Sequence, residues 1–136
     1  MLKQVSLFTE NTEGGLFKIT SILAKADINI YTMLANDSAE FGIIRLIVDK
    51  PELAIDVLND NGYQCRQDKV IAVVMEDTPG YLDGILAAIH GANIDISYLY
   101  ISFDRSTVKP VVIFKTNEPE TATFLIGRGY KLLESY

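Results

Sequence analysis

The chain has 136 residues, 49% of them hydrophobic, and its 18 acidic and 12 basic side chains give a net charge of −6, which argues against binding to nucleic acid. Its one cysteine, Cys65, excludes an internal disulfide, and its apolar runs are far shorter than the roughly 20 residues of a membrane-spanning helix. Because residues 1–6 lack the apolar stretch of a signal peptide, we expect a cytoplasmic protein that binds neither membranes nor nucleic acid.

The first half of the chain predicts the order strand, helix, strand, strand, helix, strand. Apolar residues recur every three or four positions from Leu16 to Ala26, which is the spacing of one helix face. Pro51 can open the second helix, where a missing N–H costs nothing, and Gly62 ends it. The predicted strands are 5–8, 28–36, 41–48 and 63–67, and the predicted helices begin at residues 16 and 51.

The second half repeats the first. Residues 11–16 align with residues 77–82, which lie 66 positions later, and the match continues without a gap to residues 30 and 96. Residues 50–54 align with residues 118–122 at an offset of 68, and Gly62 aligns with Gly129 at an offset of 67. We infer two domains, residues 1–68 and 69–136. The second copy predicts strands at 70–75, 94–102, 111–116 and 131–135 and helices at 81–92 and 119–128.

This element order predicts an α+β protein of two tandem βαββαβ domains, each with an antiparallel sheet and both helices on one face. Each sheet then has a bare face and an unpaired edge strand, and such edges attract partners. The only linker that the sequence offers is Asp68-Lys69. A linker this short predicts a fixed junction, as a continued sheet or as stacked sheets, and domain junctions often hold small-ligand pockets.

The best candidate site is the turn between the first strand and the first helix, which occurs in both halves. A helix N-terminus offers unpaired N–H groups and partial positive charge for a carboxylate, and glycine lets a ligand approach the backbone. The side chain of Asn11 or Asp77 could hold an ammonium group. The alternative is that Asn11 and Asp77 only cap the turn and that Gly14 and Gly80 only supply a backbone angle.

The pattern Asn-x-x-Gly-x-Leu-x-x-Ile-x-x-x-Leu-x-x-Ala-x-Ile-Asn-Ile, from Asn11 to Ile30, resembles the ACT domain, an amino-acid-binding regulatory module of many biosynthetic enzymes. Residues 77–96 are similar to the same signature, so the resemblance covers nearly the whole chain. The second copy has the usual Pro-Gly, whereas Glu13 stands where the family usually has proline. We therefore do not expect the two loops to be equivalent in shape or affinity.

The resemblance implies ferredoxin-like domains that pair side by side and bind ligands at their interface. It also implies that the loop after the first strand contacts the ligand together with the start of the second strand of the partner domain. The matching positions in the first copy are Asn11, Gly14, Gly15, Leu16 and Asn29, and in the second copy Asp77, Gly80, Tyr81, Leu82 and Asp95. Asn29 and Asp95 are equally well explained as the polar ends of buried strands.

Two tyrosines alternate along the second strand of the second copy. This alternation predicts that Tyr98 and Tyr100 point the same way as Ile94 and Ile96, as core or interface packing or, alternatively, as the lining of a pocket. Met33, which aligns with Leu99, is predicted to lie in the core.

The residues give little support for catalysis. His90, the only histidine, lies late in a helix beside a core position, and Cys65 has no cation-rich setting, so neither predicts a reactive group. Without a histidine cluster or a second cysteine the sequence predicts no transition-metal site. We expect no cofactor, no metal and no catalytic residue.

The predicted function is therefore a stand-alone sensor that binds a free L-amino acid, forms a homodimer, and signals to an enzyme or regulator partner or to its own assembly. One alternative is a small ferredoxin-like enzyme that uses Asp77 or Glu13, although neither carboxylate has a positioned partner. Another is an RNA-binding module, because residues 40–45 distantly resemble an RNP strand. That motif needs a basic first residue and stacking aromatics, and Glu40 stands first here.

Overall fold

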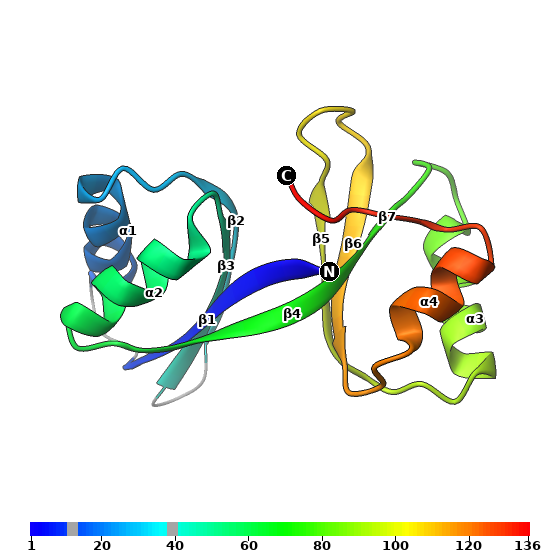
Figure 1. The fold of residues 1–136 in the computed structure, drawn as a ribbon, viewed down its shortest axis with the longest axis horizontal. Coiled ribbons are helices and arrows are strands. Elements are labelled where there is room, and N and C mark those ends of the chain that lie inside the picture. The colour runs from blue at the N-terminus through cyan, green and yellow to red at the C-terminus, as the bar shows by residue number, and fades with distance from the viewer. Residues whose placement is uncertain (11–13, 38–40) are drawn as a thin grey trace. The chain divides into compact units, whose positions relative to one another are not determined.

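The computed structural model describes residues 1–10, 14–37 and 41–136. The chain divides into two compact units, which we name the first unit, Lys3–Asp68, and the second unit, Lys69–Tyr136 with Met1–Leu2. In each unit the elements follow the order strand, helix, strand, strand, helix, strand (Figure 1). The predicted fold class, two tandem ferredoxin-like βαββαβ domains, is confirmed.

The first unit builds its sheet in the order β2-β3-β1-β4. Antiparallel pairing places Val5 opposite Leu46 and Ile30 opposite Val48. Both helices lie on one face of this sheet (Figure 1). The elements are β1 (Leu2–Glu10), α1 (Gly15–Lys25), β2 (Ile30–Asp37), β3 (Phe41–Val48), α2 (Pro51–Asp60) and β4 (Gln64–Val74), which continues into the second unit. The buried core contains Val5, Leu7, Ile19, Leu23, Ile28, Ile44, Leu46, Val48, Ala54 and Leu58.

The second unit repeats this topology in the order β5-β6-β4-β7. The N-terminal ammonium of Met1 pairs with the Glu134 carboxylate, and Met1 and Leu2 belong to this unit. The predicted boundaries had placed both residues in the first domain. Its remaining elements are α3 (Tyr81–Gly91), β5 (Ile96–Phe103), β6 (Pro110–Thr116), α4 (Thr121–Gly127) and β7 (Lys131–Leu132). The core contains Ile71, Val73, Met75, Ile85, Ile89, Val112, Phe114 and Leu125.

The repeat extends to backbone angles. The residue two positions after α1, Asp27, and its counterpart after α3, Asn93, both have a φ of 57°. This left-handed conformation ends a helix, and Asp and Asn tolerate it better than most residues with a side chain. The chain therefore turns into β2 and β5 in the same way.

Burial corrects the predicted alignment of the second helices. Ala54 and Leu58 are the buried residues of α2, and Thr121 and Leu125 are those of α4, so the true offset is 67. The offset of 68 predicted for residues 50–54 was wrong, because it matched the Pro-Glu pairs. Pro51 is the first residue of α2, whereas Pro119 precedes α4.

The predicted linker is also absent. Asp68 and Lys69 are strand residues, because β4 runs without a break from Gln64 to Val74. The sequence predicted two strands because polar residues interrupt its apolar pattern here.

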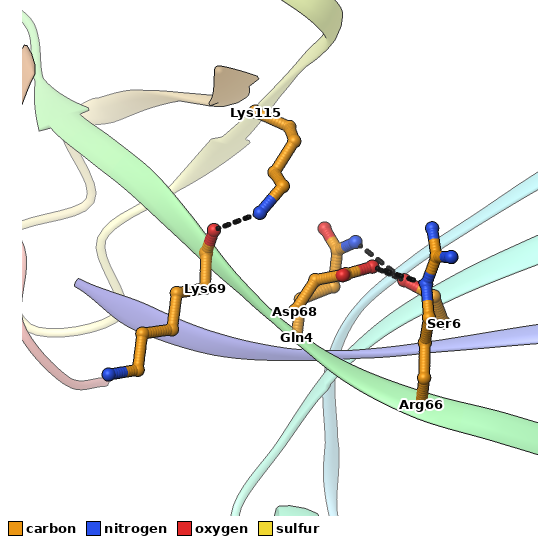
Figure 2. A network of polar contacts seen from close by, with 6 residues as sticks. All are labelled: Gln4, Ser6, Arg66, Asp68, Lys69 and Lys115. Carbon is orange, nitrogen blue, oxygen red and sulfur yellow. Dashed lines mark hydrogen bonds and ion pairs between the residues drawn. The ribbon is translucent and has the colours of Figure 1, made fainter. Parts of the chain in front are cut away.

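A hydrogen-bond network accounts for these polar residues (Figure 2). Within the first unit the side-chain amide of Gln4 donates to the Ser6 hydroxyl at 2.9 Å, and that hydroxyl donates to the Asp68 carboxylate at 2.8 Å. Arg66 Nε donates to the same carboxylate oxygen at 3.2 Å. Gln4 and Ser6 are buried, and a buried polar group is tolerated when it is hydrogen-bonded. Within the second unit Lys115 Nζ donates to the Lys69 carbonyl at 3.3 Å.

The predicted direction of Tyr98 and Tyr100 was wrong, because β5 contains a β-bulge. The pairing of β5 with β6 shifts between Ile96 and Tyr98, so that Leu99 lies opposite Phe114 and packs against the core. A bulge inserts one residue and reverses the alternation beyond it. Tyr98 and Tyr100 therefore point to the face opposite that of Ile96. The first unit has the same shift in β2, and Met33 packs against its core, as predicted.

The hairpin between β5 and β6 is organised by one carboxylate. Asp104 is only 5% exposed and accepts hydrogen bonds from the Ser106 backbone N–H at 3.1 Å, the Ser106 hydroxyl at 2.9 Å and the Thr107 hydroxyl at 2.8 Å. The backbone N–H of Val108, whose φ is 59°, donates to the Asp104 carbonyl at 2.7 Å. The carboxylate thus fixes a turn that contains a strained residue.

Acid should loosen this turn. Hydrogen bonds from the Thr107 hydroxyl and then from the Ser106 N–H hold the pKa of Asp104 below its ordinary value of 3.8. The ionised carboxylate therefore stabilises the hairpin fully above pH 3.8, and this contribution disappears as the pH falls through the lowered pKa. Hydrogen exchange of the Val108 amide, measured between about pH 5 and about pH 2, checks this. The Asp104→Asn variant should lack the transition, and the same transition in that variant would contradict the assignment.

Candidate functional site

Each of the two predicted loops leads into a helix, and the two helices begin in the same way. Gly14 and Gly80 precede α1 and α3 in the left-handed conformation, with φ values of 76° and 87°. Their carbonyls accept the first helical hydrogen bonds, from Lys18 and Gly84, each at 3.0 Å. A Cβ atom added at either glycine would meet nothing within 4 Å. Glycine is therefore needed for the backbone angle, and the space beside it is open.

Within residues 1–10, 14–37 and 41–136, no side-chain cap is found at either helix start, α1 or α3. Asp77 is exposed, and the alternative that it caps α3 is wrong. Asn11, like Thr12 and Glu13, lies outside the described residues. Among the described residues no capping side chain satisfies the first N–H groups of the two helices, although in α3 the Tyr81 N–H donates to the Thr78 carbonyl at 3.3 Å. The N–H groups that remain are suited to an anion.

The two helix starts differ in how open they are. In the second unit Tyr81 and Leu82 pack against the core, and the Tyr81 ring meets the Tyr130 ring edge-on at 6.3 Å with an interplanar angle of 83°. In the first unit Gly15 stands in place of Tyr81, and Leu16 is 47% exposed. The next residue, Phe17, is 77% exposed. The start of α1 is therefore the more accessible of the two.

Charge near the second helix start comes from residues that the sequence did not indicate. Lys109 Nζ donates to the Glu76 carboxylate at 2.8 Å, and this hydrogen bond, more than the charge of Glu76 itself, raises the pKa of Lys109. Tyr81 contributes a smaller effect in the same direction. Lys109 and Tyr130 lie far along the chain from this loop, and no local pattern places them here.

Asn29 and Asp95 do not join the loop of their own unit. The end of β1 pairs with Phe41 and the end of β2 with Gly42, whereas the start of β2, next to Asn29, pairs with Val48 at the other end of the sheet. Seven residues of strand separate these ends by about 23 Å. Asp95, which precedes β5, has the same place in the second unit.

Asn29 instead pairs with Asp49, beside the start of β2 and the end of β3. Its backbone N–H donates to the Asp49 carboxylate at 2.9 Å, and its carbonyl accepts from the Asp49 N–H at 3.1 Å. The exposed side chain of Asn29 takes no part in these bonds. A site that combines Gly14 with an Asn29 side chain therefore needs the two residues to come from two copies of the chain.

Two residues were weighed for chemistry, His90 and Cys65. His90 is exposed on α3, and burial raises the pKa of the half-buried Cys65 thiol to about 11, so that it stays protonated at neutral pH. In the part of the chain that the structure describes, no group of three or more His, Cys, Asp or Glu residues is placed to hold a metal ion. None of the described helices is long and apolar enough to cross a membrane.

Comparisons with known proteins find a matching family model and similar solved structures for nearly the whole chain. The family model for an ACT domain pair matches residues 1–132. The crystal structure of protein BT0572 from Bacteroides thetaiotaomicron is 28% identical, covers 97% of this chain and 91% of its own, and superposes with a TM-score of 0.89. The regulatory subunit of aspartate kinase from Thermus thermophilus is 14% identical, with coverages of 93% and 90% and a TM-score of 0.68. No curated protein matches the sequence.

Proposed function

The chain belongs to the ACT domain family, as a pair of ACT domains in tandem, and we propose that it is a regulatory protein that binds a free L-amino acid without changing it chemically. The observation that carries the proposal is the duplicated helix start, in which a left-handed glycine precedes a helix that no described side chain caps. The regulatory subunit named above belongs to an amino-acid kinase, which is consistent with this role.

The proposed ligand contacts follow from charge. The N-terminal N–H groups of α1, at Gly15 and Leu16, would donate to the ligand carboxylate, where the helix dipole also favours an anion. Asn11 would accept a hydrogen bond from the ammonium group. Asn29 of a second copy of the chain would complete the pocket, because it lies too far from Gly14 within one unit.

The second copy would have a subordinate role. Gly80, Tyr81 and Leu82 form the equivalent helix start, with Asp77 and Asp95 in the places of Asn11 and Asn29. Tyr81 and Leu82 are partly buried and pack against the core, and a carboxylate at Asp77 repels a carboxylate ligand. We propose that this loop completes the pocket or stays empty, and that the protein acts as a cytoplasmic homodimer on an enzyme or regulator partner.

The test is a thermal-shift screen of the twenty amino acids, followed by calorimetry. At a concentration of 100 times its dissociation constant, a true ligand should add about 2.7 kcal/mol to the free energy of unfolding. The amide and the N-acetyl derivative of that amino acid are the matched controls. Each lacks one of the two charges that the site recognises, so neither should bind. Equal binding of a blocked form would remove the proposed geometry, and the absence of any binding amino acid would remove the function.

A further inference from the structure

The two edge strands of the second unit differ in how well they are protected from further pairing. Proteins usually protect an edge strand by making it short or by placing charged residues or proline on it. β7 has only two residues, one of which is Lys131. β5 has eight residues, none of them charged and none of them proline, and beyond the bulge at its start it pairs regularly with β6. β5 is therefore the unprotected edge of this unit.

The outer edge of β5 is formed by Leu99, Ile101 and Phe103. At the end of the hairpin the Asp104 N–H donates to the Lys109 carbonyl at 2.7 Å. Successive pairs of an antiparallel ladder alternate between bonded and non-bonded, so the N–H and C=O groups of Leu99, Ile101 and Phe103 point away from β6. The side chains of Ile101 and Phe103 are 55% and 46% exposed. The backbone groups that can pair with a further strand and the apolar side chains that it can cover thus belong to the same residues.

The equivalent strand of the first unit, β2, is less apolar at its end. At the offset of 66, the exposed residue Ala35 stands in the place of Ile101. The sequence of β2 ends with Asp37, where β5 ends with Phe103. Both strands have the same bulge and pair in the same way with the strand that follows them. The repeat therefore makes this a matched comparison, in which the backbone is the same and the apolar edge is found in the second unit.

The two ends of β5 carry opposite charges. Asp95, which is exposed, comes directly before the strand. Arg105, which is also exposed, follows Asp104, whose buried carboxylate is bonded within the hairpin. A strand that pairs antiparallel with β5 begins beside Arg105 and ends beside Asp95. Charge complementarity therefore favours a segment that begins with an acidic residue and ends with a basic one.

We propose that β5 binds an extended segment of a partner protein, which adds to the sheet as an antiparallel strand with alternating apolar residues, an acidic start and a basic end. The β5 edge would be the place where the regulated partner attaches, so this assignment rests on the proposed function for the existence of that partner. The proposed homodimer is formed by the first unit, where Asn29 of one copy meets Gly14 of the other. Pairing of β5 with itself as well would join such dimers into larger assemblies, so we assign β5 to a different protein.

The experiment measures binding of a labelled peptide, acetyl-Glu-Val-Thr-Val-Thr-Val-Thr-Lys-amide, to the full chain by fluorescence anisotropy with no amino acid present. The wild type should bind it with a dissociation constant below about 1 mM. I101K should weaken binding by about tenfold or more, because it places a charge on the apolar edge. The matched control is A35K, which places the same side chain at the equivalent position of β2 and should bind like the wild type. Circular dichroism and melting temperature check that each variant is folded.

Two altered peptides test the mode of binding. N-methylation of the valines removes the N–H groups that would face β5 and keeps the side chains, so this peptide should not bind measurably. Exchange of the terminal Glu and Lys should weaken binding about threefold to tenfold, because each charge then meets a like charge on the protein. Equal binding of the exchanged peptide would overturn the antiparallel arrangement.

The remaining outcomes decide whether a partner strand occupies β5. A wild type that does not bind the peptide would overturn the proposal, as would equal binding of the N-methylated peptide or an equal loss in I101K and A35K. Sedimentation equilibrium of the same variants covers the other occupant. A dimer that I101K dissociates and A35K does not would assign β5 to a second copy of this chain and would overturn the proposal too. The peptide assay needs no amino acid, so failure of the proposed ligand site would leave its result unchanged.

Discussion

Replacing Phe114 with alanine should lower the free energy of unfolding by about 3 to 5 kcal/mol. Among the residues whose burial the structure describes, Phe114 is the largest fully buried side chain, and it lies on β6 within the core of the second unit. Its removal takes away the transfer free energy of the ring and leaves a cavity that the surrounding strands can close only in part. Urea unfolding followed by circular dichroism measures the change, and hydrogen exchange should assign the loss to the second unit.

The control for this loss is Phe17→Ala. The same ring is removed, but Phe17 is 77% exposed on the first turn of α1, so the change should stay within about 0.5 kcal/mol. A loss of similar size in both variants would mean that the ring at position 114 does not lie in a closed core.

Replacing Asn11 with alanine should weaken amino-acid binding by about 1 to 3 kcal/mol, the cost of losing a hydrogen bond to a charged group. The matched variant Asp77→Ala should weaken binding less, because Tyr81 and Leu82 close the second helix start against its own core. Calorimetry with the amino acid found in the thermal-shift screen gives both values. The melting temperature without ligand should change by no more than a few degrees in Asn11→Ala.

The outcomes of this pair are distinct. Loss of binding in Asp77→Ala together with normal binding in Asn11→Ala would move the principal site to the second unit. Normal binding in both variants would mean that the loops are only structural. Strong loss in both would indicate that each ligand needs one loop from each copy of the domain.

The repeat explains why so much of the fold could be predicted from the sequence. Helix periodicity and turn residues are local signals, and here each is present twice in register, as with Gly14 and Gly80 or Asp27 and Asn93. The predicted helices at residues 16 and 81 begin within one residue of α1 and α3. That Gly14 and Gly80 supply a backbone angle was an alternative that the sequence left open, and both have the left-handed conformation in the structure.

Features that depend on register required the structure. The bulge that turns Tyr98 away from the core is a property of the pairing between β5 and β6, and the sequence of β5 alone still alternates. The sequence predicted that the strand breaks at Asp68. In the structure this carboxylate accepts hydrogen bonds from Ser6 and Arg66, and Ser6 lies 62 residues away along the chain.

The sequence by itself therefore determined the two-copy βαββαβ architecture and the glycine-led helix starts, since periodicity, turn chemistry and duplication are all written in adjacent residues. Only the tertiary structure showed the contact of Tyr81 with Tyr130 at the second helix start, because it joins residues far apart in the chain. The tertiary structure also showed that Asn29 lies far from Gly14 within one unit. Antiparallel pairing puts the C-terminal end of β1 and the start of β2 at opposite ends of the sheet. Long-range contacts of this kind depend on which strands pair and in which register, and short-range sequence patterns carry no record of either.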